Sequence, residues 1–220
     1  TIKNRTIMKK LIPILFVVAA ITACQKEPSL SELDDDYVVF TDYDKSANFD
    51  NYLTYYMPDS VLLITDSEKA TYWTNDEANY ILETFAENMA SRGFLLVDTK
   101  EEADLGLQVS YIEDVHYFVD YPNSYWWWGY PGYWGPGYWG PYWSTWYYPY
   151  PVVYSYSVNS FLAELVDLTD QTGTSKRLNI LWDTYMAGLQ SSSPRVNRNL
   201  VIQAIDQAFV QSPYLLTNQE

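Results

Sequence analysis

The chain has very few residues that can carry out covalent or metal chemistry, since its 220 residues include one cysteine, Cys24, and one histidine, His116. A disulfide within the chain is excluded because it needs two cysteines. A structural zinc site lacks the second His or Cys that it would recruit. A Ser–His–Asp triad would rest on His116 alone, and the sequence has no G-x-S-x-G elbow. We therefore expect no enzymatic activity, no bound metal and no cofactor.

Basic residues are also scarce, because 13 Lys and Arg stand against 28 Asp and Glu, for a formal net charge of -15. No cluster of Lys and Arg is present to neutralise phosphates, so nucleic acid is excluded as a partner. Aromatic residues, by contrast, make up 18 % of the chain, which argues against disorder over its whole length. The length is enough for one ordinary domain with a core.

The N-terminal residues have the layout of a secretory signal. Lys9 and Lys10 follow Met8, and an apolar run extends from Leu11 to Ala20. This run is shorter than the roughly 20 apolar residues of a stable membrane span. We expect residues 1–23 to be a signal peptide, with the stretch before Met8 an upstream extension or a misplaced start.

The sequence "ITAC", which ends at Cys24, resembles the lipobox of bacterial lipoproteins: a branched residue, two small residues and an invariant cysteine. In that family the cysteine is acylated and becomes the first residue of the mature chain. The resemblance implies that Cys24 is lipidated and that the protein contacts a membrane through this anchor. Residues 24–36 are polar and without periodicity, and we expect them to form a lipidated tether.

The residues after Cys24 bear on location. Gln25 rather than Asp follows the cysteine, which resembles sorting to the outer membrane. The acidic stretches "QKE" and Asp34–Asp36 resemble the surface-export tag of Bacteroidetes lipoproteins, although Pro28 interrupts it. We expect a lipid-anchored outer-membrane protein, on the periplasmic side or at the cell surface.

Residues 37–220 contain the patterns of an ordered domain. A capping box at Thr74 and Glu77 and a left-handed cap at Gly93 bound a predicted helix with one apolar stripe. A second helix is predicted from a cap at Ser193–Pro194 to a stop before Pro213. Strand patterns occupy residues 37–44, 51–57, 60–64, 94–98, 103–115, 158–168 and 176–186, the last two joined by a Gly-containing turn.

The order of these elements predicts the fold class. The strands are mostly linked by short turns, and the two helices are separated by a block of strands. This order favours an α+β, two-layer sandwich in which a mostly antiparallel sheet carries both helices on one face. We expect residues 37–220 to be a single domain, with a long aromatic, Gly/Pro-rich insert at 118–151 between central strands.

Several stretches between residues 38 and 214 resemble DUF4136, a domain of unknown function found in bacterial lipoproteins. "DYDKSANFDNYLTYY" at Asp42–Tyr56 resembles the opening of that family, and "SRGF" followed by "EEADLGLQVSY" resembles its helix end and next strand. "LAELVDLTDQTGTSKRLNILWDTYMAG" resembles its hairpin, with Trp182 as the diagnostic tryptophan. Asp183 stands where a basic residue is common, and we expect it to be exposed. The resemblance implies the fold and an envelope location, but no catalytic residues.

The opening stretch also has a calcium-like register, in which alternate residues carry side-chain oxygens. The two most constraining positions of an EF-hand loop hold Ala47 and Leu53 instead of Gly and Glu. We therefore favour an Asx-type turn at the end of a strand. The register itself consists of Asp42, Asp44, Ser46, Asn48 and Asp50.

The aromatic insert repeats "GYWGP" at 132–136 and 137–141, and seven of the nine Trp lie between Trp126 and Trp146. Its Gly and Pro exclude a helix and interrupt any ladder. It is not a membrane span, because a span must satisfy its backbone groups internally. Four interpretations remain: a packed surface loop, a platform for sugar rings or partner side chains, a membrane-interface element, and homotypic association.

We favour a contact role for the insert. Burying seven tryptophans within one loop is difficult, and leaving them all bare invites aggregation. The absence of basic residues from 112 to 175 disfavours contact with anionic headgroups. We expect a non-enzymatic binding or structural module that contacts an envelope protein or a glycan, with the oligomeric state left open. The candidate contact surface consists of Trp126, Trp127, Trp128, Tyr133, Trp134, Tyr138, Trp139, Trp143 and Trp146.

An envelope glycoside hydrolase is the alternative. Glu113, Asp114 and Asp120 lie near the insert in the sequence. Two carboxylates beside an aromatic cleft are the arrangement of many glycosidases. Their separation in space decides between the two hypotheses, and the sequence does not give it.

Overall fold

The computed structural model of the protein describes residues 37–65, 71–113, 146–147, 159–169, 178–188 and 197–218. The predicted signal peptide, the tether with Cys24 and most of the aromatic insert lie outside these ranges. Residues Tyr37–Glu220 cluster into one compact unit. No helix within the described ranges is long and apolar enough to cross a membrane.

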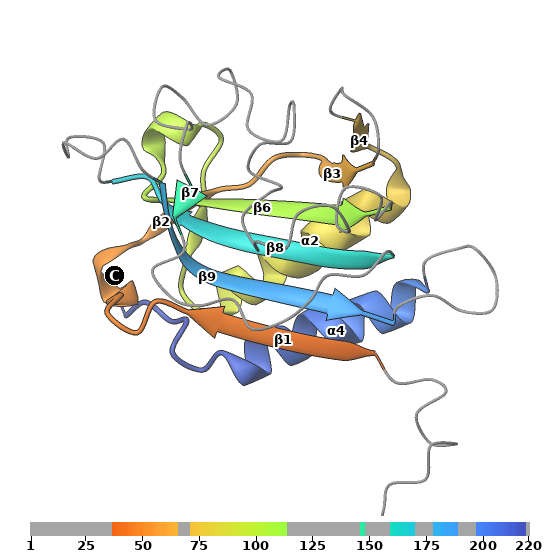
Figure 1. Ribbon diagram of the computed structural model, residues 1–220. Helices are drawn as coiled ribbons and strands as arrows, with labels where there is room; N and C mark the ends of the chain where they lie inside the picture. The colour runs from red at the N-terminus through yellow and green to blue at the C-terminus, as the bar shows by residue number, and fades with distance from the viewer. Residues whose placement is uncertain are drawn as a thin grey trace, which may run out of the picture. The chain divides into compact units, whose positions relative to one another are not determined.

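Four long strands lie side by side in the sheet, each antiparallel to the next (Figure 1). Strand β6 (Leu105–Ile112) pairs with β8 (Ser160–Asp167), and β8 pairs with β9 (Leu178–Ala187). Strand β1 (Val38–Tyr43) pairs with the other side of β9. The predicted α+β fold with a mostly antiparallel sheet is therefore confirmed for its long strands.

Short strands at the far side of β6 are parallel to it, which the sequence patterns do not indicate. Strands β2 (Thr54–Tyr56) and β3 (Val61–Ile64) pair with successive parts of β6, and β5 (Leu95–Leu96) extends the sheet beyond β2. Strand β4 (Thr71–Trp73) is antiparallel to β3. Parallel neighbours need a crossover connection. Helix α2, which follows β4 in the chain, supplies it.

Helix α2 (Asp76–Ser91) begins one residue later than the predicted capping box requires. Asn75 is the N-cap, and its side-chain oxygen accepts a hydrogen bond of 3.0 Å from the Ala78 amide. The prediction of Thr74 as the cap was therefore wrong, and Asn is the stronger N-cap of the two residue types. The end of the helix is as predicted, because Gly93 has a φ of 90°.

Helix α4 (Arg198–Gln211) lies beside α2 on the same face of the sheet (Figure 1). It ends before Pro213 as predicted, but begins at Arg198 rather than directly after Ser193–Pro194. Two short 3-10 turns, η2 (Phe49–Asn51) and η3 (Lys100–Glu102), lie in the connections between these elements.

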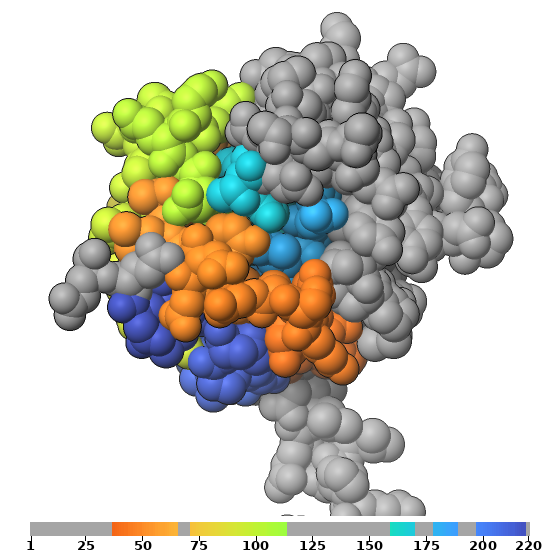
Figure 2. Space-filling model, turned by 90° about the vertical axis from the view of Figure 1, so that its left-hand side faces the viewer, coloured from red at the N-terminus to blue at the C-terminus, as the bar shows by residue number. Residues whose placement is uncertain are grey.

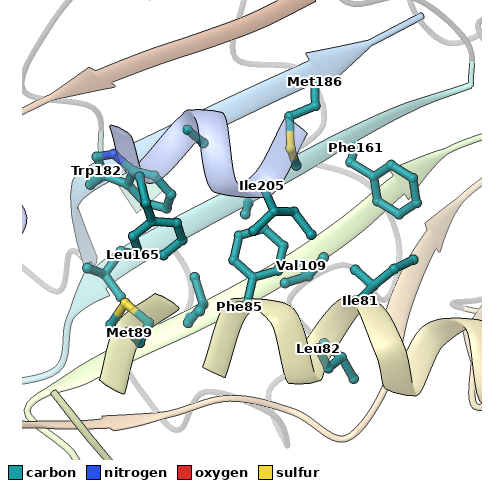
Figure 3. Close-up of a cluster of buried hydrophobic side chains, with 14 of the residues drawn as sticks. Ile81, Leu82, Phe85, Met89, Val109, Phe161, Leu165, Trp182, Met186 and Ile205 are labelled. Atoms are coloured by element: carbon teal, nitrogen blue, oxygen red, sulfur yellow. The ribbon is translucent and has the colours of Figure 1, made fainter. Parts of the chain in front are cut away.

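The core lies between the sheet and the two helices, and the predicted apolar stripe of α2 points into it (Figure 3). Phe85 of α2 meets Phe209 of α4 edge-on, with ring centroids 6.2 Å apart. Burying aromatic rings of this size contributes about 1.5–3 kcal/mol each to stability. Strand β6 contributes the alternating residues that its pattern predicts, all of them buried: Leu105, Leu107, Val109 and Tyr111.

The C-terminal residues pack against the segment that follows β1 (Figure 2). The rings of Tyr43 and Tyr214 stack with centroids 3.6 Å apart. Asn218 donates to the Asp50 carboxylate from both its main-chain and its side-chain nitrogen, at 3.0 and 3.1 Å. These contacts hold the C-terminal residues against β1 and the segment that follows it.

Candidate functional site

The aromatic insert leaves and re-enters the sheet at one place. Strands β6 and β8 are neighbours, and Ile112 at the end of β6 lies opposite Ser160 at the start of β8. All residues between them, including 118–151, therefore connect two adjacent strand ends. The predicted position of the insert between central strands agrees with this topology.

A group of hydrogen bonds, here called the neck, closes the base of this connection. The Asn159 amide donates to the Ile112 carbonyl at 2.6 Å, and the Tyr111 hydroxyl donates to Asn159 Oδ1 at 3.1 Å. Asn159 has a φ of 61°, a left-handed conformation that Asn tolerates better than most residues. On the other side of β6, the Glu113 amide donates to the Ile64 carbonyl at 2.9 Å. The strand ends that flank the insert are thus held together.

Two residues near the C-terminal end of the insert pair with a strand of the sheet. Strand β7 (Trp146–Tyr147) pairs in parallel with Leu178 and Asn179 at the start of β9. Trp146 is the one residue of the candidate contact surface that lies within the described ranges, through its backbone. The others are not among the described residues: Trp126, Trp127, Trp128, Tyr133, Trp134, Tyr138, Trp139 and Trp143.

A row of polar side chains crosses the face of the sheet opposite the helices. Gln108, Glu164 and Asp183 are successive neighbours on β6, β8 and β9. Directly opposed residues of antiparallel strands have Cβ atoms about 5 Å apart. All three side chains are buried, with exposed fractions of 3 %, 0 % and 0 %. The prediction that Asp183 is exposed was therefore wrong.

Burial of this polar row requires partners, because an uncompensated buried carboxylate is very costly. Gln108 Nε2 donates to the Val109 carbonyl at 2.9 Å. Glu164 and Asp183 each have a bonding or electrostatic partner as well. The alternation of Gln108 and Glu164 with core residues in their strands could have indicated that they share a face. It could not have indicated that this face is buried.

Two side chains of the opening stretch, Asp44 and Asn48, make turns. Asp44 Oδ1 accepts from the Ser46 amide at 2.8 Å and from its hydroxyl at 2.6 Å. Asn48 Oδ1 accepts from the Asp50 amide at 3.3 Å and caps η2. The Asx-type turn is confirmed. Within the described ranges, no group of three or more His, Cys, Asp or Glu side chains is arranged to hold a metal ion.

Two further acids join the start of β2 to the rest of the sheet. Asp104 Oδ2 accepts from the amides of Leu53 and Thr54 at 2.8 and 3.0 Å. The Tyr52 hydroxyl donates to Asp167 Oδ2 at 3.1 Å. Burial, and then the charge of Asp167, raise the pKa of Tyr52 above its ordinary value. These carboxylates have structural partners, and sequence spacing gave no indication of the pairs.

The acids of the alternative hydrolase hypothesis are not brought together by the described residues. Glu113 is exposed and follows β6 directly. Asp114 and Asp120 lie outside the described ranges, as does His116. Glu164 and Asp183, which are neighbours on β8 and β9, have no exposed surface.

Comparisons with known proteins bear on the family. The family model described as a domain of unknown function, DUF4136, matches residues 39–214. The crystal structure of a DUF4136 family protein from Bacteroides thetaiotaomicron is 49 % identical over 84 % of this chain and 100 % of that chain, with a TM-score of 0.76. Comparison with curated protein sequences finds no match.

A more distant structure is the PelC dodecamer from Paraburkholderia phytofirmans, which is 11 % identical over 84 % of this chain and 100 % of that chain. Its TM-score is 0.40, too low for an argument about assembly or function. The family model spans most of the described domain, and the Bacteroides member of the family is 49 % identical to this chain. The chain therefore belongs to the DUF4136 family.

Proposed function

We propose that the protein is a lipid-anchored envelope protein whose domain is a non-enzymatic binding module, and that the aromatic insert contacts a partner protein or a glycan. The lipid on Cys24 would hold the domain at the outer membrane, and residues 24–36 would serve as the tether. The sheet and helices would supply a rigid base for the insert.

One observation carries the proposal: the two strand ends that flank the insert are joined, and two residues within the insert pair with β9. The neck joins Ile112 to Asn159, and β7 pairs Trp146 and Tyr147 with the start of β9. A segment held in this way loses less conformational entropy on binding than a free loop does. Tryptophan and tyrosine are the residues that most often dominate binding interfaces and stack on sugar rings.

The rival hypothesis, a glycoside hydrolase, has less support. A general acid and a nucleophile or base must reach the glycosidic bond, and their carboxyl groups stand about 5–10 Å apart. Glu164 and Asp183 are near enough to each other, but no substrate reaches side chains without exposed surface. Of the opening acids, Asp44 accepts hydrogen bonds within a turn and Asp50 accepts hydrogen bonds from Asn218.

Replacement of residues 126–143 by a Gly/Ser linker tests the proposed contact. This variant retains the neck and β7, so circular dichroism and thermal unfolding should change little. We expect binding to purified cell-wall sacculi or outer-membrane polysaccharide, or site-specific cross-linking to an envelope protein, to fall at least tenfold. Replacement of residues 170–175 by the same type of linker is the control and should leave binding intact. Unchanged binding in the first variant would remove the insert from the contact surface.

A Cys24→Ala variant tests the anchor separately. The wild-type protein should fractionate with outer membranes and label with a radioactive fatty acid. The variant should carry no label and should leave the membrane fraction. Equal labelling of both proteins would contradict lipidation at Cys24.

A further inference from the structure

We propose that the domain has a second contact site, independent of the insert, that binds an extended segment of a partner protein carrying alternating apolar and basic side chains. The site is a groove between helix α2 and the loop that follows β2, with a volume of 280 Å³. It is called here the α2–β5 groove. The residues that define it are Met57 and Asp59 of the loop, Leu82 and Glu83 of α2, and Leu96 of β5.

Strand β5, whose Leu96 lines the groove, has an open edge. It is the last strand of the sheet order, and in the described ranges no strand pairs with its outer side. The amides of Leu95 and Val97 donate to the carbonyls of Leu53 and Tyr55 in the β2 segment, both at 2.9 Å. Since successive residues of a strand direct their main-chain groups to opposite sides, the Leu96 amide and carbonyl face outward. Such an edge is a template for one more strand.

Apolar surface is concentrated at this edge. Leu95 and Leu96 are 55 % and 53 % exposed, although each is part of the sheet. Met57 is half-buried beside them, and Leu82 is buried at the floor of the groove. A pairing segment would therefore bury leucine side chains as well as form main-chain hydrogen bonds.

The charges of the groove select the chemistry of the occupant. Asp59 and Glu83 are exposed carboxylates, and no Lys or Arg is among the lining residues. A second copy of this chain, with a formal net charge of -15, would bring like charge to the site. A glycan is disfavoured because no aromatic ring lines the groove. A segment with Lys or Arg beside apolar residues matches both the carboxylates and the leucines.

A synthetic probe tests this inference on the full-length protein purified in mild detergent. The probe is a capped heptapeptide of alternating Val and Lys, and the control peptide has Glu in place of Lys. We expect hydrogen–deuterium exchange to slow at residues 94–97 on addition of the Val–Lys peptide, saturably and less at high salt. The Val–Glu peptide should give no protection.

Substitutions to lysine at single residues test where the peptide binds. Glu83→Lys should weaken the Val–Lys peptide at least about fivefold, the scale of an exposed ion pair replaced by repulsion. Glu87→Lys, on an exposed residue of the same helix outside the groove lining, is the matched control and should change affinity less than about twofold. Leu96→Lys should abolish protection of residues 94–97, whereas Val210→Lys, at an exposed residue of α4, should not.

Several results would overturn the proposal. Absence of binding by the Val–Lys peptide, equal binding of the Val–Glu peptide, or protection confined to other residues would each exclude this occupant. Concentration-dependent self-association that Leu96→Lys abolishes would assign the edge to a second copy of the chain instead. Replacement of residues 126–143 should leave peptide binding unchanged, so failure of the insert as a contact surface would not affect this site.

Discussion

The indole nitrogen of Trp182 donates a hydrogen bond of 2.8 Å to the hydroxyl oxygen of Ser212, and both residues are completely buried. Trp182 belongs to β9, whereas Ser212 directly follows α4. The bond therefore joins the sheet to the end of the second helix. The Tyr214 hydroxyl donates to the same oxygen at 3.3 Å, so the C-terminal residues depend on this serine as well. The tryptophan that marks the family in sequence thus has a structural role.

Replacement of Trp182 by Phe should destabilise the domain by about 2–3 kcal/mol. The change leaves part of a large buried volume empty and removes one buried hydrogen bond. Urea unfolding followed by circular dichroism measures the loss. Trp73→Phe is the control, since Trp73 is only partly buried, and should cost less. A loss below about 0.5 kcal/mol at Trp182 would contradict the structural role of the indole.

Any residue larger than glycine at position 93 should destabilise the folded domain. A Cβ atom there would lie 2.6 Å from the carbonyl oxygen of Thr217, in a backbone conformation with φ of 90°. Gly93→Ala should therefore cost about 1–3 kcal/mol. A double-mutant cycle with a chain ending at residue 216 separates the two causes, because removal of Thr217 relieves the contact but not the positive φ. An equal cost in both backgrounds would show that the contact with Thr217 contributes nothing.

Patterns local in sequence predicted the local structure well. The apolar stripe that includes Phe85 and the stop before Pro213 identified two helices, and alternation along β6 identified the core face of the longest central pairing. The cap of α2 was misplaced by one residue because Thr74 and Asn75 are both capping residues. Competition between neighbours of similar propensity is not resolved by sequence alone.

Features that depend on distant segments were not predicted. The parallel pairing of β2 and β3 with β6 depends on the path of the chain through α2, which no local pattern contains. Asp183 was expected to be exposed, as alternate residues of an antiparallel sheet often are, but it is buried. Its burial depends on which residues cover the face of the sheet opposite the helices. The alternation of polar and apolar residues along a strand does not show this. For the candidate site, the sequence indicated the insert but neither the neck nor the attachment of β7.

High pH should destabilise the protein through Tyr55. Burial raises the pKa of Tyr55 from its ordinary value of 10.0 to about 12. The unfolded chain loses this proton near pH 10, whereas the folded protein retains it until about pH 12. The contribution of Tyr55 to stability is therefore complete below pH 10 and is lost progressively as the pH rises toward 12.

Comparison of wild type with Tyr55→Phe isolates this contribution. The phenylalanine variant should lose less stability between about pH 9 and 11 in urea unfolding, because phenylalanine has no proton to release. Tyr80→Phe, at an exposed residue of α2, is the control and should follow the wild type. Parallel curves for wild type and Tyr55→Phe would contradict the assignment of the slope to Tyr55.

The neck predicts a graded series at Asn159. Asn159→Gly retains the left-handed backbone but removes the bond from Tyr111, and should cost about 1 kcal/mol. Asn159→Val removes the same bond and also places a β-branched residue at a φ of 61°, so it should cost about 1–3 kcal/mol more. Tyr111→Phe removes the bond from the other partner, and its combination with Asn159→Gly in a double-mutant cycle measures the coupling. A coupling near zero, or a Val variant as stable as the Gly variant, would contradict the neck. The Val variant should also weaken any contact made by the insert more than Trp182→Phe does at the same fraction folded. The reason is that the neck joins the strand ends that flank residues 118–151, whereas Trp182 lies in the core.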